Sequence, residues 1–176
     1  SRWAVLGATA IFINVGAEVA IGTQKALFLN TPGIWGVSLE QAGKAVSFYW
    51  GGAMIGRAIG TVLLARFPAT RLMALFATIA AAMCAYVMIV GGVSAGYVAL
   101  AIGLFNSIMF PVIFTLTLER STASEEATSG LLCTGIIGGA AIPALAGAVT
   151  DATSFVASFI VPATCYVLLV LFAMRA

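Results

Sequence analysis

The sequence is poor in charged residues and has no histidine at all. Only 8% of its 176 residues are charged, whereas 62% are hydrophobic and the mean hydropathy is +1.12. Soluble domains carry about 25% charged residues, because water must solvate their surface. This composition excludes a soluble globular domain, and it excludes a disordered chain, which needs the opposite balance. The sequence therefore predicts an integral membrane protein.

The missing residue types also restrict the chemistry. Without histidine the chain has no Ser–His hydrolase site and no imidazole metal site, and its few acidic residues do not cluster as cation ligands do. The net charge of +2 gives no basic patch for a nucleic acid. The three cysteines lie in apolar stretches without CxxC spacing and are interpreted as small helix residues. We expect no enzyme activity, no cofactor, no metal and no nucleic-acid partner.

Long apolar runs predict membrane-spanning helices rather than barrel strands, because strands would alternate polar and apolar residues. A helix rising about 1.5 Å per residue needs about 20 residues to cross a hydrocarbon core of about 30 Å. Turn signals, such as the Asn-Thr-Pro-Gly cluster at 30–33, separate the runs. The predicted fold is all-α, with six transmembrane helices near 4–29, 43–65, 71–91, 94–118, 127–150 and 154–174.

The basic residues predict the orientation, since cytoplasmic loops are enriched in Lys and Arg. Only Lys25 and Lys44 are expected near the outer face. Five arginines fall on the other side if the N-terminus is cytoplasmic: Arg2, Arg66, Arg71, Arg120 and Arg175. Both termini are therefore predicted to be cytoplasmic.

The six spans divide into two similar groups of three. The first and fourth spans each carry a buried amide, Asn14 and Asn106, and the second and fifth are rich in glycine. An odd number of helices per group inserts the second group upside down, as in the inverted repeats of secondary transporters. The predicted arrangement is a 3+3 inverted repeat.

Small residues in the second and fifth spans predict close helix packing. Glycines that recur every four residues line one helix face and let a neighbouring helix approach. Prolines within a span remove a backbone hydrogen bond and bend the helix. In a transporter, the same positions would let helices rock or bend. The candidates for packing and hinge roles are Gly52, Gly56, Gly60, Pro111, Gly135, Gly139 and Pro143.

The most informative residue is Glu18, about halfway along the first span. A carboxylate inside the hydrocarbon slab costs several kcal/mol unless it is protonated, paired or hydrated, so Glu18 should face the bundle interior. Asn14 lies one turn earlier on the same face. With Gln24 and with Asn106 of the fourth span, these side chains are candidates to bind a substrate or an ion. The alternative is a polar clamp between helices that binds no ligand.

Arg57, in the second span, is predicted to lie nearer the cytoplasmic face, where it can extend its charge toward water. Glu119, at the end of the fourth span, is a candidate partner. We expect these two residues to form a structural ion pair at an inner gate.

Four segments resemble helices seven, eight, ten and eleven of the fucose/glucose/galactose permeases, which are sugar–proton symporters of the major facilitator superfamily. They are 12–22 (FINVGAEVAIG), 47–57 (SFYWGGAMIGR), 105–116 (FNSIMFPVIFTL) and 135–143 (GIIGGAAIP). The resemblance implies one half of a major facilitator fold, the C-terminal half of a twelve-helix carrier in a bacterial inner membrane. Asn14 departs from the pattern, because an aromatic residue is expected there.

The resemblance also implies a function: import of a hexose-type monosaccharide with a proton, or with sodium, by alternating access. The partner would be the N-terminal six-helix half, to which the family's proton-coupling carboxylates belong. Trp50 and Phe105 are candidates to offer ring faces to the sugar. The sequence begins at Ser1 without an initiator Met, so we expect it to be part of a longer protein.

Two other readings remain open. The chain could be a self-sufficient six-helix protein that assembles into a carrier or pore, for which a two-fold pair is the default. It could also be a membrane scaffold without transport.

Overall fold

The computed structural model describes all 176 residues, and the ordered elements are all helical. The prediction of an all-α protein is therefore confirmed. The elements are α1 (Arg2–Asn30), α2 (Leu39–Leu64), α3 (Ala69–Val90), α4 (Gly92–Asn106), α5 (Met109–Arg120), α6 (Glu125–Thr134), η1 (Gly135–Ile137), α7 (Gly138–Ala152), η2 (Ala157–Phe159) and α8 (Ile160–Arg175).

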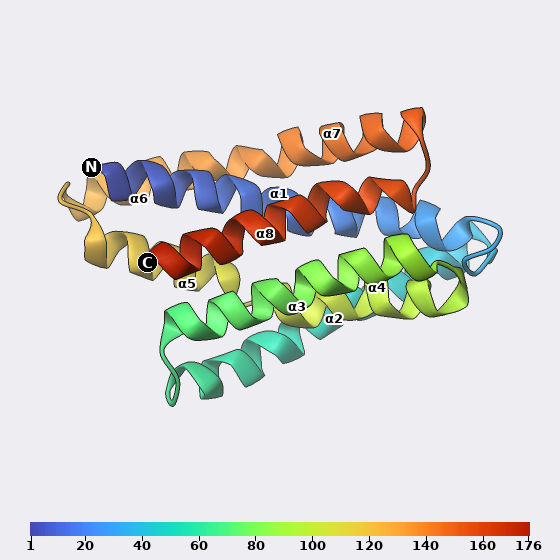
Figure 1. The fold of residues 1–176 in the computed structure, drawn as a ribbon, viewed down its shortest axis with the longest axis horizontal. Helices are drawn as coiled ribbons and strands as arrows, with labels where there is room; N and C mark the ends of the chain where they lie inside the picture. Colours follow the sequence, from blue (N-terminus) through green and yellow to red (C-terminus); the bar gives the residue numbers. More distant parts are fainter.

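The helices lie side by side in an elongated bundle, with both chain ends at the same end of it (Figure 1). α1 has the most neighbours, because it packs against α7, α8, α5 and α2. α2 packs on α4, and α3 packs on both α8 and α4. Residues of α1 therefore reach most of the interior, and α1 also carries Glu18.

Turn residues account for the short connections. Gly33 and Gly36, after α1, have φ angles of 93° and 62°, which residues with a side chain rarely adopt. Ser38 then caps α2 by accepting a hydrogen bond from the backbone N–H of Gln41. Gly91 and Gly92, again with positive φ, join α3 directly to α4. The chain thus reverses direction in a few residues.

Two of the expected spans are not continuous α-helices. The span expected near 94–118 is divided at Ser107 and Ile108 into α4 and α5. Pro111 accounts for this break: it has no N–H to donate to the carbonyl of Ser107, and its ring crowds that turn. The span expected near 127–150 is interrupted by the 3-10 turn η1, and Pro143 lies inside α7.

Five helical stretches are long and apolar enough to cross a membrane: Arg2–Asn30, Ala69–Val90, Gly92–Arg120, Glu125–Ala152 and Ala157–Arg175. The 26-residue helix α2 is not among them. It begins with a polar turn that contains Glu40 and Gln41, and it carries Lys44 and Arg57 further along. Its length is sufficient, but no stretch of it is as apolar as those five.

Glycines allow the closest helix approaches. A side-chain carbon at Gly56 would collide with the backbone carbonyl of Leu104, and one at Gly60 with the side chain of Ile108. On the other side of the bundle, Gly135 and Gly138 bring the η1 region against the backbone of α1. Gly52 and Gly139 have looser neighbours, at 3.6 Å and 3.1 Å from the position of such a carbon. Helix contacts without side chains replace the hydrophobic driving force that lipid does not supply.

Gly56→Ala should lower stability by about 1–3 kcal/mol, because the added methyl group meets backbone that cannot move without shifting α4. Gly43→Ala is the matched control: it lies on the same helix and has nothing within 4 Å, so it should be neutral or slightly stabilising. Thermal unfolding of the two purified variants in detergent measures the difference. Equal melting temperatures would contradict the close contact between α2 and α4.

Candidate functional site

Glu18 lies where α1 faces α2, and its side chain is half-buried. Arg57 of α2 is exposed and close enough to act electrostatically on Glu18, although no ion pair within 4 Å joins them. The ring of Trp50 lies against Gly22, one turn beyond Glu18, and is 44% exposed. Glu18, Trp50 and Arg57 therefore share one partly open edge of the bundle, here called the Glu18 edge.

The register of α2 explains why Trp50 and Arg57 are found together. They are seven residues apart, which is two helical turns, so they lie on the same face. Tyr49, next to Trp50, points to the interior and is fully buried. Its hydroxyl donates a hydrogen bond of 3.0 Å to the backbone carbonyl of Glu18, which fixes α2 against α1 at this level.

Directly behind the Glu18 edge, Asn106 joins two buried tyrosines. Its Nδ2 donates to the hydroxyl of Tyr49 at 2.8 Å and to the hydroxyl of Tyr166 at 3.2 Å. Asn106 is 1% exposed, and its Oδ1 has no partner. Since Tyr49 also bonds Glu18, these contacts connect α1, α2, α4 and α8. We call Tyr49, Asn106 and Tyr166 the tyrosine–amide network.

Asn14 is fully buried, and neither Oδ1 nor Nδ2 of its amide has a hydrogen-bond partner. Gly7 meets Thr117, and Lys25 meets Ala99, so α1 runs antiparallel to α4 and α5. In this register Glu18 lies opposite Asn106, and Asn14 lies about one turn further along, beside the break between α4 and α5. Buried polar groups normally have partners, so this amide marks a place with unused hydrogen-bonding capacity.

Lys25 is the main buried polar residue that the sequence interpretation did not identify. It is expected near the outer face as an indicator of orientation, and in the structure its side chain is 1% exposed and lies in the bundle interior. Its Nζ donates to the backbone carbonyl of Ala99 and lies 3.8 Å from the centroid of the Tyr49 ring. A carbonyl oxygen and an aromatic face both attract a cation, which offsets part of the cost of burying it. The sequence did hold a signal for this burial: Lys25 lies three helical turns from Asn14, on the same face of α1.

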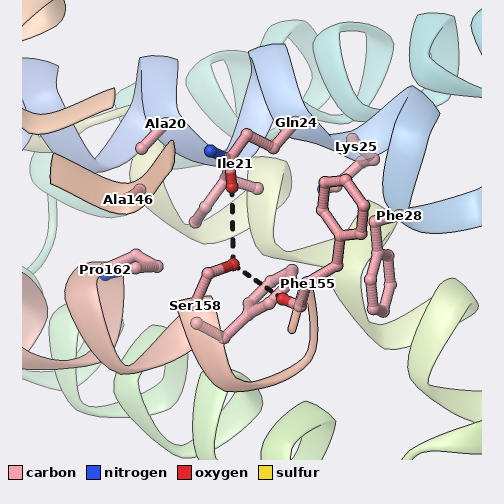
Figure 2. Close-up of a pocket in the computed structure, with 10 residues that line it drawn as sticks. Ala20, Ile21, Gln24, Lys25, Phe28, Ala146, Phe155, Ser158 and Pro162 are labelled. Atoms are coloured by element: carbon pink, nitrogen blue, oxygen red, sulfur yellow. Dashed lines mark hydrogen bonds between the residues drawn. The ribbon is translucent and has the colours of Figure 1, made fainter. Parts of the chain in front are cut away.

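Gln24 faces α7 and the start of α8 (Figure 2). Its Oε1 accepts hydrogen bonds from Thr150 at 3.2 Å and from Ser158 at 3.4 Å. The cavity beside it, which Phe28 and Pro162 also line, has a volume of about 10 Å³. That is room for one water molecule at most. The carbonyl group of Gln24 is thus used to join helices.

Phe105 packs on Phe76 of α3, with ring centroids 5.6 Å apart at 83°. It therefore belongs to the packing between α4 and α3, whereas Trp50 lies on the Glu18 edge.

The predicted ion pair between Arg57 and Glu119 is wrong. The one ion pair in the structure is the exposed pair of Lys44 and Glu40, at 2.9 Å within α2. Glu119 lies at the far end of α5, in a shallow hollow with Ala69 and Thr115. Arg57 instead lies on the side of α2 that faces Glu18. The position of a residue along its helix indicates its depth, but it does not indicate toward which neighbouring helix the side chain points.

The structure contains no group of three or more His, Cys, Asp or Glu side chains that could hold a metal ion. The Glu18 edge instead presents a carboxyl group, a guanidinium cation and an indole ring, from Glu18, Arg57 and Trp50. Such a set can donate and accept hydrogen bonds to hydroxyl groups while an apolar ring face packs against the ligand.

Sequence comparison finds sugar transporters. The chain is 41% identical over 165 residues to the glucose/galactose transporter of Brucella abortus, which covers 94% of the chain and 40% of that relative. It is 37% identical over 177 residues to a putative glucose/galactose transporter of Helicobacter pylori, covering 97% of the chain and 43% of the relative. It is 32% identical over 179 residues to the L-fucose-proton symporter of Escherichia coli, covering 98% of the chain and 39% of the relative. No family model matches the chain.

Comparison with solved structures agrees. The major facilitator superfamily transporter FucP in the outward conformation matches with a TM-score of 0.91 at 29% identity, over 99% of this chain and 41% of that one. A second structure, of the E. coli fucose:proton symporter FucP, matches with a TM-score of 0.94 at 27% identity, over 99% of this chain and 43% of that one.

The chain is therefore a homologue of major facilitator superfamily transporters, and it has their fold. More particularly, the resemblance to the C-terminal half of the fucose/glucose/galactose permeases is confirmed. The chain spans about 40% of the length of the curated relatives that it matches.

Tyr49→Phe should destabilise the protein by about 1–3 kcal/mol, because it removes the hydroxyl that serves both Asn106 and the Glu18 carbonyl. Tyr97→Phe is the control, since Tyr97 is 63% exposed and its hydroxyl makes no hydrogen bond within the chain. Thermal unfolding in detergent would measure the two variants side by side. A Tyr49→Phe protein as stable as the control would mean that the tyrosine–amide network does not hold the helices together.

Proposed function

We propose that the chain forms one half of a secondary active transporter that imports a hexose-type sugar together with a proton. The observation that supports this most directly is the Glu18 edge. A carboxylate, a guanidinium group and an indole lie together on a membrane-embedded bundle, and its own helices leave them partly uncovered. Intramembrane charges of this kind face a partner or a water-filled cavity.

In this proposal the missing partner is the N-terminal half of the same carrier. The sugar binds between the halves, with Glu18 and Arg57 bonding its hydroxyl groups and Trp50 packing against its apolar ring face. Asn106 and Asn14 lie one layer deeper, where their free amide atoms can bond the sugar or a water molecule that accompanies it. Gln24 and Phe105 support the site from behind through their helix contacts.

We further propose that α2 crosses the membrane as the sixth span. Its 26 residues are long enough, and its charged residues face the other half rather than lipid. The six spans then form the 3+3 inverted repeat expected from the sequence. Both termini lie at one end of the bundle, which we assign to the cytoplasmic side of a bacterial inner membrane.

Alternating access requires elements that bend or slide. The break between α4 and α5 beside Pro111 and the η1 turn before Pro143 are the proposed bending points. The glycine contacts of α2 with α4, and of η1 with α1, provide smooth surfaces for sliding. The break between α4 and α5 lies close to the level of Glu18, so a small change there would alter the Glu18 edge, whereas η1 contacts α1 two to three turns away, near Ala8 and Ile11.

The coupling ion is proposed to be a proton, because one relative is named as a proton symporter. Sodium is the alternative. The single carboxylate of the Glu18 edge lies beside Arg57, a positive neighbour that disfavours a sodium ion there. We assign the proton-carrying carboxylate to the N-terminal half, as the resemblance to the permeases implies.

Glu18→Gln in the complete carrier should lower sugar binding by at least about tenfold, because a charge-assisted hydrogen bond to the substrate becomes a neutral one. Glu40→Gln, on the exposed first turn of α2, is the control and should bind like the unchanged carrier. A panel of monosaccharides in a binding assay, with counterflow exchange in vesicles, measures both. Unchanged affinity and exchange in Glu18→Gln would reject the substrate role of this residue, and sugar uptake by this chain alone would reject the half-carrier.

A further inference from the structure

A groove lies between the first half of α1 and the last turns of α8. These parts of the two helices lie at the end of the bundle where the chain begins and ends (Figure 1). Its volume is about 230 Å³. The lining is mainly apolar and includes Leu6, Ala10 and Ile13 of α1, and Leu168, Leu171 and Phe172 of α8. All of the lining residues belong to α1 and α8, and none comes from α7.

The groove has the length of one lipid leaflet. It extends along α1 from Trp3 to Ile13, which is about 15 Å at 1.5 Å per residue. The hydrocarbon core of a bilayer is about 30 Å thick, so one leaflet contributes about half of it. The groove therefore matches the extent of one acyl chain in one leaflet.

Unpaired positive charge lies at the surface end of the groove. Arg175 lines it directly. The guanidinium carbon of Arg120 lies 5.2 Å from the centroid of the Trp3 ring, which also lines the groove. The one ion pair of the structure is between Lys44 and Glu40, so no carboxylate lies within 4 Å of either arginine. Glu119, next to Arg120 in sequence, lies in a different hollow with Pro111 and Ala69.

Trp3 contacts both the apolar wall of the groove and Arg120 at its surface end. Its ring packs edge-on against Phe172, with centroids 6.4 Å apart at 74°, and thereby forms part of the wall beside Arg175. Tryptophan is typical of the membrane–water interface, where its ring lies at the level of the headgroups. The surface end of the groove thus has an aromatic side wall and two arginines.

We propose that this groove binds an anionic phospholipid of the adjoining leaflet. One acyl chain lies in the apolar groove, and Arg120 and Arg175 bond the phosphate at its surface end. Arginine binds phosphate oxygens through paired N–H groups, and basic sites between membrane helices on one leaflet bind anionic headgroups. The length, the apolar lining and the uncompensated charge all fit this one occupant.

The lipid site is separate from the Glu18 edge. On α1, at about 100° per residue, the groove residues are centred roughly a third of a turn away from Glu18. Glu18 faces α2, whereas the groove opens between α1 and α8. Loss of the lipid site and loss of the sugar site can therefore be measured independently.

The experiment uses the full-length carrier purified in detergent and incubated with either phosphatidylglycerol or phosphatidylcholine of the same chain length. Native mass spectrometry counts the lipids retained, and a thermal melt reports the stability that each lipid gives. We expect phosphatidylglycerol to bind about tenfold more tightly than phosphatidylcholine, because two arginines contact its phosphate without a competing ammonium group.

The variant is Arg120→Gln with Arg175→Gln, and Arg66→Gln, an exposed arginine outside the groove, is the control. The double variant should lose the preference for phosphatidylglycerol, whereas Arg66→Gln should keep it. Ala10→Leu, at the floor of the groove, should lower retention of both lipids. Sugar binding shows that each variant is folded.

Three results would overturn the proposal. Equal retention of the two lipids by the unchanged carrier would mean that the groove does not select a headgroup. Equal loss in Arg66→Gln and in the double variant would assign the preference to general surface charge. Retention of neither lipid would mean that the groove is closed in the complete carrier.

Discussion

Polar groups inside a bilayer must find partners within the protein, because hydrocarbon offers none. The tyrosine–amide network meets this constraint for four helices at once: Asn106 bonds Tyr49 and Tyr166, and Tyr49 bonds the backbone of Glu18. Lys25 is accommodated against the same Tyr49 ring. The positions of α1, α2, α4 and α8 relative to one another depend on these few contacts, and glycine contacts then let the helices come close enough to form them.

The same constraint explains which groups are left without a partner. The interior satisfies Lys25, but the amide of Asn14 and Oδ1 of Asn106 remain free, and Glu18 and Arg57 stay unpaired at the edge of the bundle. These groups lie at one level of the bundle, beside the break between α4 and α5. The chain covers about 40% of its transporter relatives, and in the proposed carrier the other half would supply the missing partners.

The sequence predicts the general fold well, because the length of an apolar run indicates directly whether a helix can cross the bilayer. All-helical structure, an integral membrane protein and the relation to sugar permeases follow from composition and from four motifs. Pro111 and Pro143 indicated that the fourth and fifth spans bend, but the run lengths did not predict that the fourth span divides at Ser107 and Ile108 or that the 3-10 turn η1 interrupts the fifth. They also did not predict that α2 is less apolar than the five stretches long and apolar enough to cross a membrane.

The sequence located some of the polar residues better than others. It predicted that Glu18 faces the bundle interior, and the side chain is half-buried at the Glu18 edge; it predicted Asn106 as a buried amide, and Asn106 is 1% exposed. It did not identify Tyr49 and Tyr166, which look like ordinary apolar residues in their helices, and it did not predict that Lys25 is buried inside the bundle. The pair of Arg57 and Glu119 failed because helix rotation, which separates them, is defined only by packing. Which side chains meet across helices is decided by tertiary contacts, and those leave little trace in a single sequence.

The central claim is that Glu18 faces water between two halves of a carrier, and thiol labelling tests it most directly. Glu18→Cys in a cysteine-free full-length carrier is exposed to a membrane-impermeant thiol reagent in right-side-out and inside-out vesicles. Leu171→Cys, at an exposed apolar position of α8 that the account assigns to lipid, is treated in the same way. The account predicts that the cysteine at position 18 is labelled from at least one side and the cysteine at position 171 from neither. If position 18 is as unreactive as position 171 from both sides, the account is contradicted.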